Sequence, residues 1–187
     1  FPGKAAIGGL AFSPDGSRLA AVVGSRVRAK AAAPNLLLLW RVADGHEQAR
    51  KSLAAKPNDI DFHPGGTQLV VGTNGGQLLL FDAQSGDVQG QLSTEGTGFG
   101  EFPGAMKRAM GSVIKAGAFT PDGSQLYTLG EDFGKRHSNL AIWDTATRER
   151  LRLITKLSLS HTIEISRDGK LFALIAADET LQIWRTQ

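Results

Sequence analysis

Apolar residues in this chain gather in short runs, and polar residues or glycines end each run after a few positions. The first set of runs is Leu19–Val23, Leu69–Val71, Leu126–Tyr127 and Leu171–Ala177. The second set is Leu36–Trp40, Gln77–Phe81, Leu140–Trp143 and Leu181–Trp184. Runs this short, rich in branched and aromatic residues, predict β-strands. Their near-continuous apolarity predicts sheets that are covered on both faces.

Two short sequence marks punctuate these runs. The first is a polar turn that ends in glycine and directly follows an apolar residue: Ser13–Gly16, His63–Gly66, Thr120–Gly123 and Ser166–Gly169. The second is an aromatic residue with a polar neighbour that closes a run: Trp40-Arg41, Phe81-Asp82, Trp143-Asp144 and Trp184-Arg185. The Pro-Asp-Gly sequences within the first mark favour type I turns, since proline presets φ and glycine tolerates positive φ.

Both marks recur with a single period. The shortest spacing from turn mark to aromatic mark is 19 residues, and the shortest spacing from there to the next turn mark is 22. Three insertions of 9, 16 and 5 residues account for every longer spacing, so the underlying unit is 41 residues. A period of about 20–50 residues indicates a repeat architecture.

Ser/Thr-Pro-Asp-Gly turns and Trp-Asp pairs repeated at this period resemble the WD-repeat family. The resemblance covers roughly Ala6–Trp184 and implies an all-β fold, a β-propeller with four WD-like blades of four antiparallel strands each. It places the repeats at about 6–54, 55–93, 113–155 and 156–187, with an inserted loop at about 93–115, in a single domain over 1–187. The family's Gly-His dipeptide is missing, and its aspartate in the turn between the second and third strands survives only as Asp178. Packing, rather than a buried His–Asp network, is therefore expected to hold the blades. Such degenerate repeats are similar to those of bacterial WD-repeat proteins.

Four blades predict an incomplete ring, because propellers of this family usually close with about seven. We interpret the chain as the C-terminal part of a longer propeller whose remaining blades complete the ring. The alternative is that two copies of the chain form one eight-bladed ring. An unfilled strand edge is expected in either case until the ring is completed.

The composition of the chain argues against several classes of functional site. The 187 residues carry a net charge of +3 and contain no cysteine, which excludes disulfides and zinc–thiolate sites. No apolar run approaches the roughly 18 residues of a transmembrane helix, so no membrane partner is expected and a cytoplasmic location is favoured. The four histidines lack metal-ligand spacing, and Ser160-His161 has no orienting carboxylate. No close pair of carboxylates stands out, and Glu131-Asp132 is interpreted as a turn. We therefore expect neither a catalytic site, nor a metal, nor a cofactor.

The three insertions are expected to lie on one face of the propeller. They fall at about Gly24–Asn35, Ser93–Lys115 and Gly130–Asn139, and successive loops of an up-and-down blade alternate between two faces. Together they hold a charge of +4, so the excess positive charge of the chain lies in them. The candidate partner-binding residues are the basic and aromatic ones among them: Arg26, Arg28, Lys30, Phe99, Phe102, Lys107, Arg108, Lys135 and Arg136.

The leading functional hypothesis is a non-catalytic scaffold that binds a protein or peptide, preferably an acidic one, on this face. The basic side chains would orient the partner and the two phenylalanines would supply buried area. The simpler interpretation is solvated surface charge, with Phe99 and Phe102 packed on their own blade. Two alternatives stay open: binding of nucleic acid or another polyanion by the basic loops, and a ligand-sensing or regulatory propeller fused to a catalytic domain outside this chain.

Overall fold

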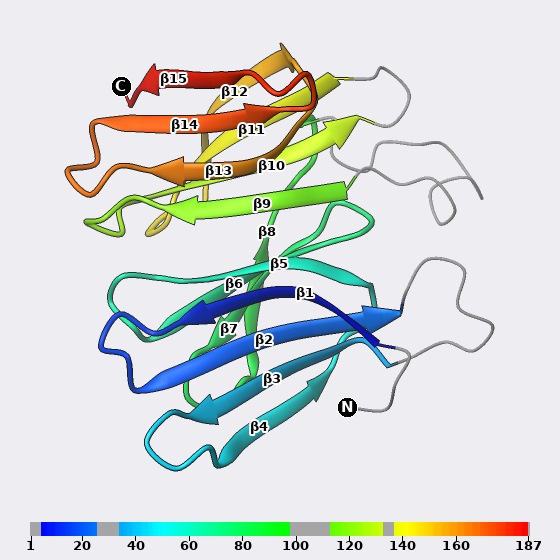
Figure 1. Cartoon of the computed structure of the whole chain (residues 1–187), viewed down its shortest axis with the longest axis vertical. Coiled ribbons are helices and arrows are strands. Elements are labelled where there is room, and N and C mark those ends of the chain that lie inside the picture. Colours follow the sequence, from blue (N-terminus) through cyan, green and yellow to red (C-terminus); the bar gives the residue numbers. More distant parts are fainter. Residues whose placement is uncertain (1–4, 26–33, 98–112, 133–136, 187) are drawn as a thin grey trace.

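The computed structural model describes residues 5–25, 34–97, 113–132 and 137–186, and these residues contain strands and no helix (Figure 1). The strands are β1 (Ala5–Phe12), β2 (Arg18–Ser25), β3 (Leu36–Arg41), β4 (Glu47–Ser52), β5 (Pro57–Phe62), β6 (Gln68–Thr73), β7 (Leu78–Asp82), β8 (Val88–Leu92), β9 (Val113–Phe119), β10 (Gln125–Asp132), β11 (His137–Asp144), β12 (Arg150–Leu157), β13 (Ser160–Ile165), β14 (Leu171–Ala176) and β15 (Leu181–Arg185).

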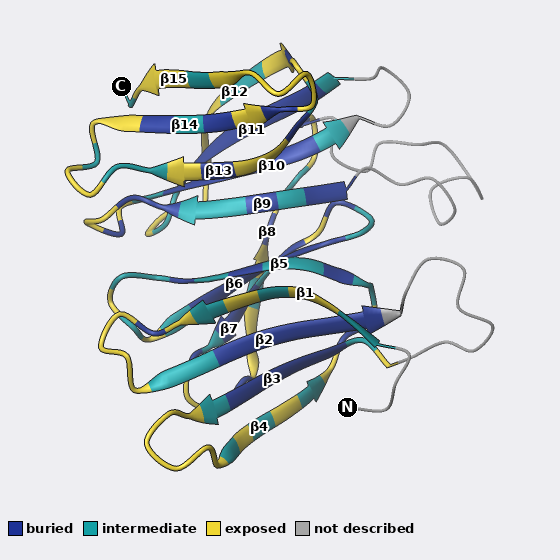
Figure 2. Ribbon diagram, viewed as in Figure 1, coloured by how far each residue is buried: buried dark blue, intermediate teal, exposed yellow. Residues whose placement is uncertain are grey.

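These strands form four antiparallel sheets, each with its strands in sequence order. Blades 1, 2 and 3 are the four-stranded sheets β1–β4, β5–β8 and β9–β12, and blade 4 is the three-stranded sheet β13–β15. The first strand of each blade is innermost, and β1 contacts β5, β5 contacts β9, and β9 contacts β13 (Figure 1). The predicted all-β propeller is confirmed. The blades form an open arc, since large apolar side chains on the two end blades stay exposed, among them Phe12 of blade 1 and Ile183 of blade 4. Figure 2 shows the exposed positions of these blades in yellow.

The turn mark forms the same hydrogen-bonded loop in blades 1, 3 and 4. In blade 3, the Thr120 hydroxyl donates to Asp122 Oδ1 at 2.6 Å, and Ser13–Asp15 and Ser166–Asp168 make the equivalent bonds at 2.6 and 2.7 Å. These hydroxyls hold the pKa of each aspartate below its ordinary value, to about 2 for Asp15 and Asp122. The sequence therefore fixes each turn by pairing a hydroxyl with a carboxylate two residues later.

The aspartate of the second mark closes the next turn of its blade. Asp144 Oδ1 accepts from the backbone N–H groups of Ala146 and Thr147, at 2.9 and 2.7 Å. Asp82 Oδ1 accepts from Gln84 and Ser85 in the same way, at 2.9 and 2.7 Å. Both carboxylates thus cap the turn that leads into the outermost strand, which explains the aspartate after the aromatic residue in blades 2 and 3.

Hydrophobic cores lie between neighbouring blades rather than within single sheets. Between blades 1 and 2, Leu37 and Leu39 of β3 pack against Phe62 and Leu69, and all four are nearly or fully buried. Each fully buried side chain of this kind stabilises the fold by about 1.5–3 kcal/mol. Because each blade buries its apolar face only against its neighbours, the pairs of blades are the stable units.

The four aromatic residues of the second mark, expected to lie in these cores, are not equally buried. Phe81 and Trp143 are buried, as expected, and Trp40 is half-buried. Trp184 stacks on Phe172 with ring centroids 6.1 Å apart but is 40% exposed. It lies on β15, the last described strand of its sheet, so no further described strand covers it.

Glu131 and Asp132, interpreted from the sequence as a turn, belong to a strand instead. They pair with Ser138 and His137 across β10 and β11. The third insertion therefore lengthens a β-hairpin, which brings the Glu131 carboxylate to 2.9 Å from Lys115 Nζ on the neighbouring β9. A strand pair continues wherever the backbone keeps its ladder hydrogen bonds, even through charged residues.

Neighbouring blades also touch through their turn marks. His63 Nε2 lies 3.0 Å from the Gly123 carbonyl oxygen and its ring meets Phe119 edge-on, with centroids 5.2 Å apart. A Cβ added to Gly123 would lie 2.5 Å from His63 Nε2. A Cβ added to the corresponding Gly16 of blade 1 would have no atom within 4 Å from any described residue beyond its chain neighbours. The two glycines have nearly the same φ, +72° and +71°.

This pair of glycines yields a matched test of the turn contact. Gly16→Ala is expected to cost about 1–2 kcal/mol from left-handed backbone strain alone. Gly123→Ala should cost about 1–2 kcal/mol more, since the new methyl group displaces the His63 ring and breaks its hydrogen bond. Urea unfolding of the two variants measures the difference, and equal losses would contradict the contact.

Candidate functional site

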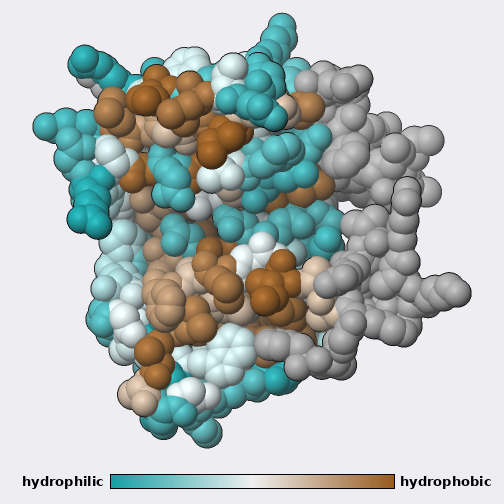
Figure 3. Space-filling view, in the orientation of Figure 1, coloured by the Kyte–Doolittle hydropathy of each residue, from teal (hydrophilic) through white to brown (hydrophobic). Residues whose placement is uncertain are grey.

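A groove runs along the innermost strands of all four blades. Its volume is about 450 Å³, and β1, β5, β9 and β13 each contribute side chains to it. The polar residues that line it are Asn58, Asp59, Asp61, Lys115, His161, Thr162 and Glu164. Figure 3 shows this middle band as mainly hydrophilic, between two hydrophobic areas. The groove is therefore the polar inner wall of the arc.

Two aspartates of β5 reach across to the next blade. Asp59 Oδ2 accepts from the backbone N–H of Gly117 at 2.7 Å, and Asp61 Oδ2 accepts from that of Phe119 at 3.3 Å. These N–H groups lie on the side of β9 that does not pair with β10, so the carboxylates take the place of a missing strand partner. Asp59 and Asp61 thus join blade 2 to blade 3 at the groove wall.

The pKa values of the same two carboxylates are raised above the ordinary value. Burial raises the pKa of Asp59 to about 6, against the lowering effect of its hydrogen bonds from Gly117 and Ile60. Burial also raises the pKa of Asp61 to about 6, and the negative charge of Asp59 adds to the rise. Glu164, on β13, contributes further repulsion to both. The groove consequently concentrates negative charge that the native structure stabilises poorly.

Small residues let the inner strands approach one another. A Cβ on Gly8 would lie 2.7 Å from the Pro57 carbonyl oxygen, and one on Gly9 would lie 3.0 Å from Ile60 N. On the other side of β5, the wall of the groove at β9 is Ala116, Gly117 and Ala118. Close approach at these small residues leaves mainly the polar side chains of β5 and β13, together with Lys115, to face the groove.

None of the nine candidate residues from the sequence can be placed. Arg26, Arg28 and Lys30, then Phe99, Phe102, Lys107 and Arg108, and finally Lys135 and Arg136 all lie outside the described residues. What the structure describes is the strand ends that flank them. Ser25 and Leu36, Leu92 and Val113, and Asp132 and His137 lie at one edge of the arc, where the innermost strands begin (Figure 1).

Asp59 and Asp61 were missed by sequence reasoning, which found no close pair of carboxylates. The available signal is the alternation Asp59-Ile60-Asp61 inside a strand, since residues two apart share one side of a strand. Ile60 points into the core between blades 1 and 2, which directs both aspartates to the opposite side. The corresponding positions, four and two residues before the turn mark, hold Gly9 and Ala11 in β1 and Thr162 and Glu164 in β13, so comparison of the repeats would have singled out blade 2 by its two carboxylates.

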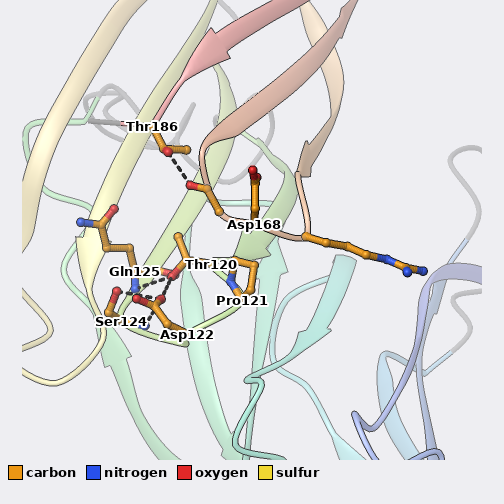
Figure 4. Close-up of a pocket in the computed structure, with 9 residues that line it drawn as sticks. Thr120, Pro121, Asp122, Ser124, Gln125, Asp168 and Thr186 are labelled. Atoms are coloured by element: carbon orange, nitrogen blue, oxygen red, sulfur yellow. Dashed lines mark hydrogen bonds between the residues drawn. The ribbon is translucent and has the colours of Figure 1, made fainter.

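A second hollow of about 310 Å³ lies at the opposite edge, between the turn marks of blades 3 and 4 (Figure 4). Thr120, Asp122, Ser124 and Gln125 line it, but their polar atoms already bond to one another within the turn. Thr186 likewise donates to the Gly169 carbonyl oxygen. The hydrogen bonds of Thr120, Asp122, Ser124 and Thr186 thus hold the turns themselves, and Arg167 and Asp168 also line the hollow.

Within the described ranges, no group of three or more His, Asp or Glu side chains is arranged to hold a metal ion. The same ranges include no helix that is long and apolar enough to cross a membrane.

Comparison with known proteins identifies the fold. No family model matches the sequence, and no curated protein matches it either. Among solved structures, the chain is similar to the β-propeller domain of Cps50 (Swd1) from Myceliophteria thermophila, with a TM-score of 0.70 and 18% sequence identity. The likeness covers 97% of this chain and 52% of that one, so the chain spans about half the length of the propeller it matches. At this identity the likeness establishes a β-propeller fold, and function has to be argued from the site.

Proposed function

We propose that this chain is a non-catalytic scaffold that binds a protein or peptide at the edge carrying its three insertions. The observation that supports the proposal most is that all described strand ends flanking the insertions lie at this one edge. A rigid stack of sheets holds such loops side by side without placing them in the core. We propose further that residues 1–187 form one partial propeller domain with the four repeats predicted from the sequence.

The chemistry of the insertions favours an acidic partner. Arg26, Arg28 and Lys30 with Lys107, Arg108, Lys135 and Arg136 supply positive charge that steers and orients a partner. Phe99 and Phe102 supply aromatic area that a partner buries. The polar groove begins at the same edge, where Lys115 and Asn58 line it. An extended peptide could follow it from there.

Affinity capture with quantitative mass spectrometry tests the proposal. A Phe99→Ala/Phe102→Ala variant should capture each partner in an amount at least about tenfold lower than the wild-type chain does. The reason is that aromatic anchors dominate interface energies. Lys170→Glu serves as the control, since its side chain is exposed on the turn at the opposite edge. Equal capture by the folded double variant and the wild type would remove this edge from consideration.

Salt dependence separates this proposal from polyanion binding by the same basic loops. A protein interface with an aromatic centre should weaken modestly between 50 and 200 mM salt, roughly two- to fivefold. Nucleic acid bound through several phosphates would weaken far more steeply, by counterion release. Titration of a fluorescent single-stranded oligonucleotide over this range distinguishes the two, and tight, steeply salt-dependent binding would favour the polyanion.

A further inference from the structure

Two apolar patches are exposed at the two ends of the arc. The first-blade patch consists of Ile7, Leu10, Phe12 and Val42, which are 59, 58, 63 and 45% exposed. The last-blade patch consists of Leu171, Ile175, Leu181 and Ile183, which are 42, 53, 63 and 63% exposed. Both are visible as hydrophobic areas in Figure 3, on the same side of the molecule. Exposed apolar groups of this extent mark a surface that another molecule covers.

The first-blade patch repeats the residues by which blade 2 contacts blade 1. Phe12 pairs with Leu19 as Phe62 pairs with Leu69, and Leu10 holds the position of Ile60. In blade 2 these positions are buried, with Phe62 and Ile60 both 4% exposed. The first-blade patch also encloses a hollow of about 450 Å³ with Trp40 and Leu19 in its wall. It therefore has the shape and chemistry of a face that receives another blade.

The last-blade patch repeats the residues by which blade 3 contacts blade 4. Ile175 pairs with Leu181 as Leu129 pairs with Leu140, two residues that are fully buried. Ile183 holds the position of Ile142, which is 4% exposed. The last-blade patch is thus the face that would pack on a following blade.

Contacts between turns support the same assignment. Gly66, Gly123 and Gly169 each lie near a side chain from the turn of the preceding blade, at 3.8, 2.5 and 3.4 Å from an added Cβ. Gly86 similarly lies near Leu39 and Lys51 of blade 1. The equivalent glycines of blade 1, Gly16 and Gly45, have nothing within 4 Å. Among the described residues, blade 1 thus has no neighbouring side chain at the two turn positions where blade 2 has one.

We propose that a second copy of this chain covers both patches, so that two arcs form one closed ring of eight blades. The first-blade patch of each copy packs on the last-blade patch of the other, and a two-fold axis relates the copies. Two such contacts close the ring. Two copies fit one ring because the chain matches about half of a solved propeller and because both patches open on one side. The hydrophilic groove between the patches then faces its counterpart across a hydrated channel.

Sedimentation velocity on the 187-residue chain tests this inference. The wild type should sediment as a dimer, with a fitted mass twice the 19.9 kDa of one chain. Leu10→Glu and Ile183→Glu should each weaken the dimer at least roughly 100-fold, since each places charge in both buried contacts. Val88→Glu is the matched control: Val88 is 65% exposed but belongs to β8, outside both patches, so this variant should stay dimeric. Circular dichroism verifies that each variant keeps its strands.

Mixing the variants identifies which faces meet. An equal mixture of Leu10→Glu and Ile183→Glu chains should regain dimer, because one of its two contacts then joins unaltered patches. If like patches met instead, Ile183→Glu alone would stay dimeric, which would overturn the proposal. Assemblies larger than a dimer would exclude a closed ring. A wild-type chain that stays a folded monomer at about 100 µM would also overturn it, and would leave additional blades or another partner as the cover.

Discussion

Trp143→Ala is expected to destabilise the fold by about 3–5 kcal/mol, because it empties a large space in a closely packed core. Trp143 is 1% exposed and lies in the core between blades 2 and 3, with Leu80 and Phe119. Its indole Nε1 donates to Thr128 Oγ1 at 2.8 Å, in a buried hydrogen bond. The midpoint and slope of urea unfolding, followed by circular dichroism, measure the loss.

Two further variants separate the contributions to this effect. Trp143→Phe keeps most of the apolar volume but leaves Thr128 Oγ1 without its indole donor, at an expected cost of about 1–3 kcal/mol. Trp184→Ala is the matched control, since Trp184 holds the same position of the repeat but is 40% exposed. It should cost less than half as much as Trp143→Ala. Equal losses at the two sites would show that the cores between blades are not the main source of stability.

Stability is expected to fall as the pH rises from about 4 to 7, because of Asp59 and Asp61. The folded-state pKa of each is raised to about 6, above an unfolded value near 3.8. The native state therefore binds more protons than the unfolded state in this window, and ionisation favours unfolding. For the two neighbouring carboxylates together, the loss should be about 2–4 kcal/mol.

Asp59→Asn/Asp61→Asn should remove this dependence and raise stability at pH 7 by a similar amount. An asparagine side-chain oxygen can still accept from Gly117 and Phe119 without carrying charge. Asp122→Asn is the control, because the pKa of this turn carboxylate is lowered, to about 2. The stabilising effect of Asp122 is lost mainly below pH 4, so the slope between pH 4 and 7 should change little. A double variant with the wild-type slope would mean that these carboxylates do not govern it.

Sequence pattern predicted the blades because each mark has a local physical cause. A hydroxyl and a carboxylate two residues apart close the turn after β1, β9 and β13, whatever surrounds them. Burial was harder to predict, since it depends on what lies beside the sheet. Trp143 and Trp184 follow the same pattern, yet among the described strands only the first has a further strand, β12, beside it in its sheet.

The polar inner wall was harder still to predict. Asp59 and Asp61 lie in an ordinary strand, and only the packing of β5 against β9 brings them to the backbone N–H groups they accept from. Sequence alone does not reveal which side of an inner strand faces a neighbouring sheet and which faces the groove. The nine candidate residues of the insertions remain predictions, and the capture experiment tests two of them, Phe99 and Phe102.

The repeated contact between blades has a consequence for how such chains change in length. The described junctions use equivalent positions, as Phe62 and Phe119 do at the ends of β5 and β9. Duplication or deletion of one whole repeat would therefore join surfaces that already match, with no new interface to evolve. Modular growth of this kind lets a lineage alter ring size in single steps while each sheet keeps its own sequence rules.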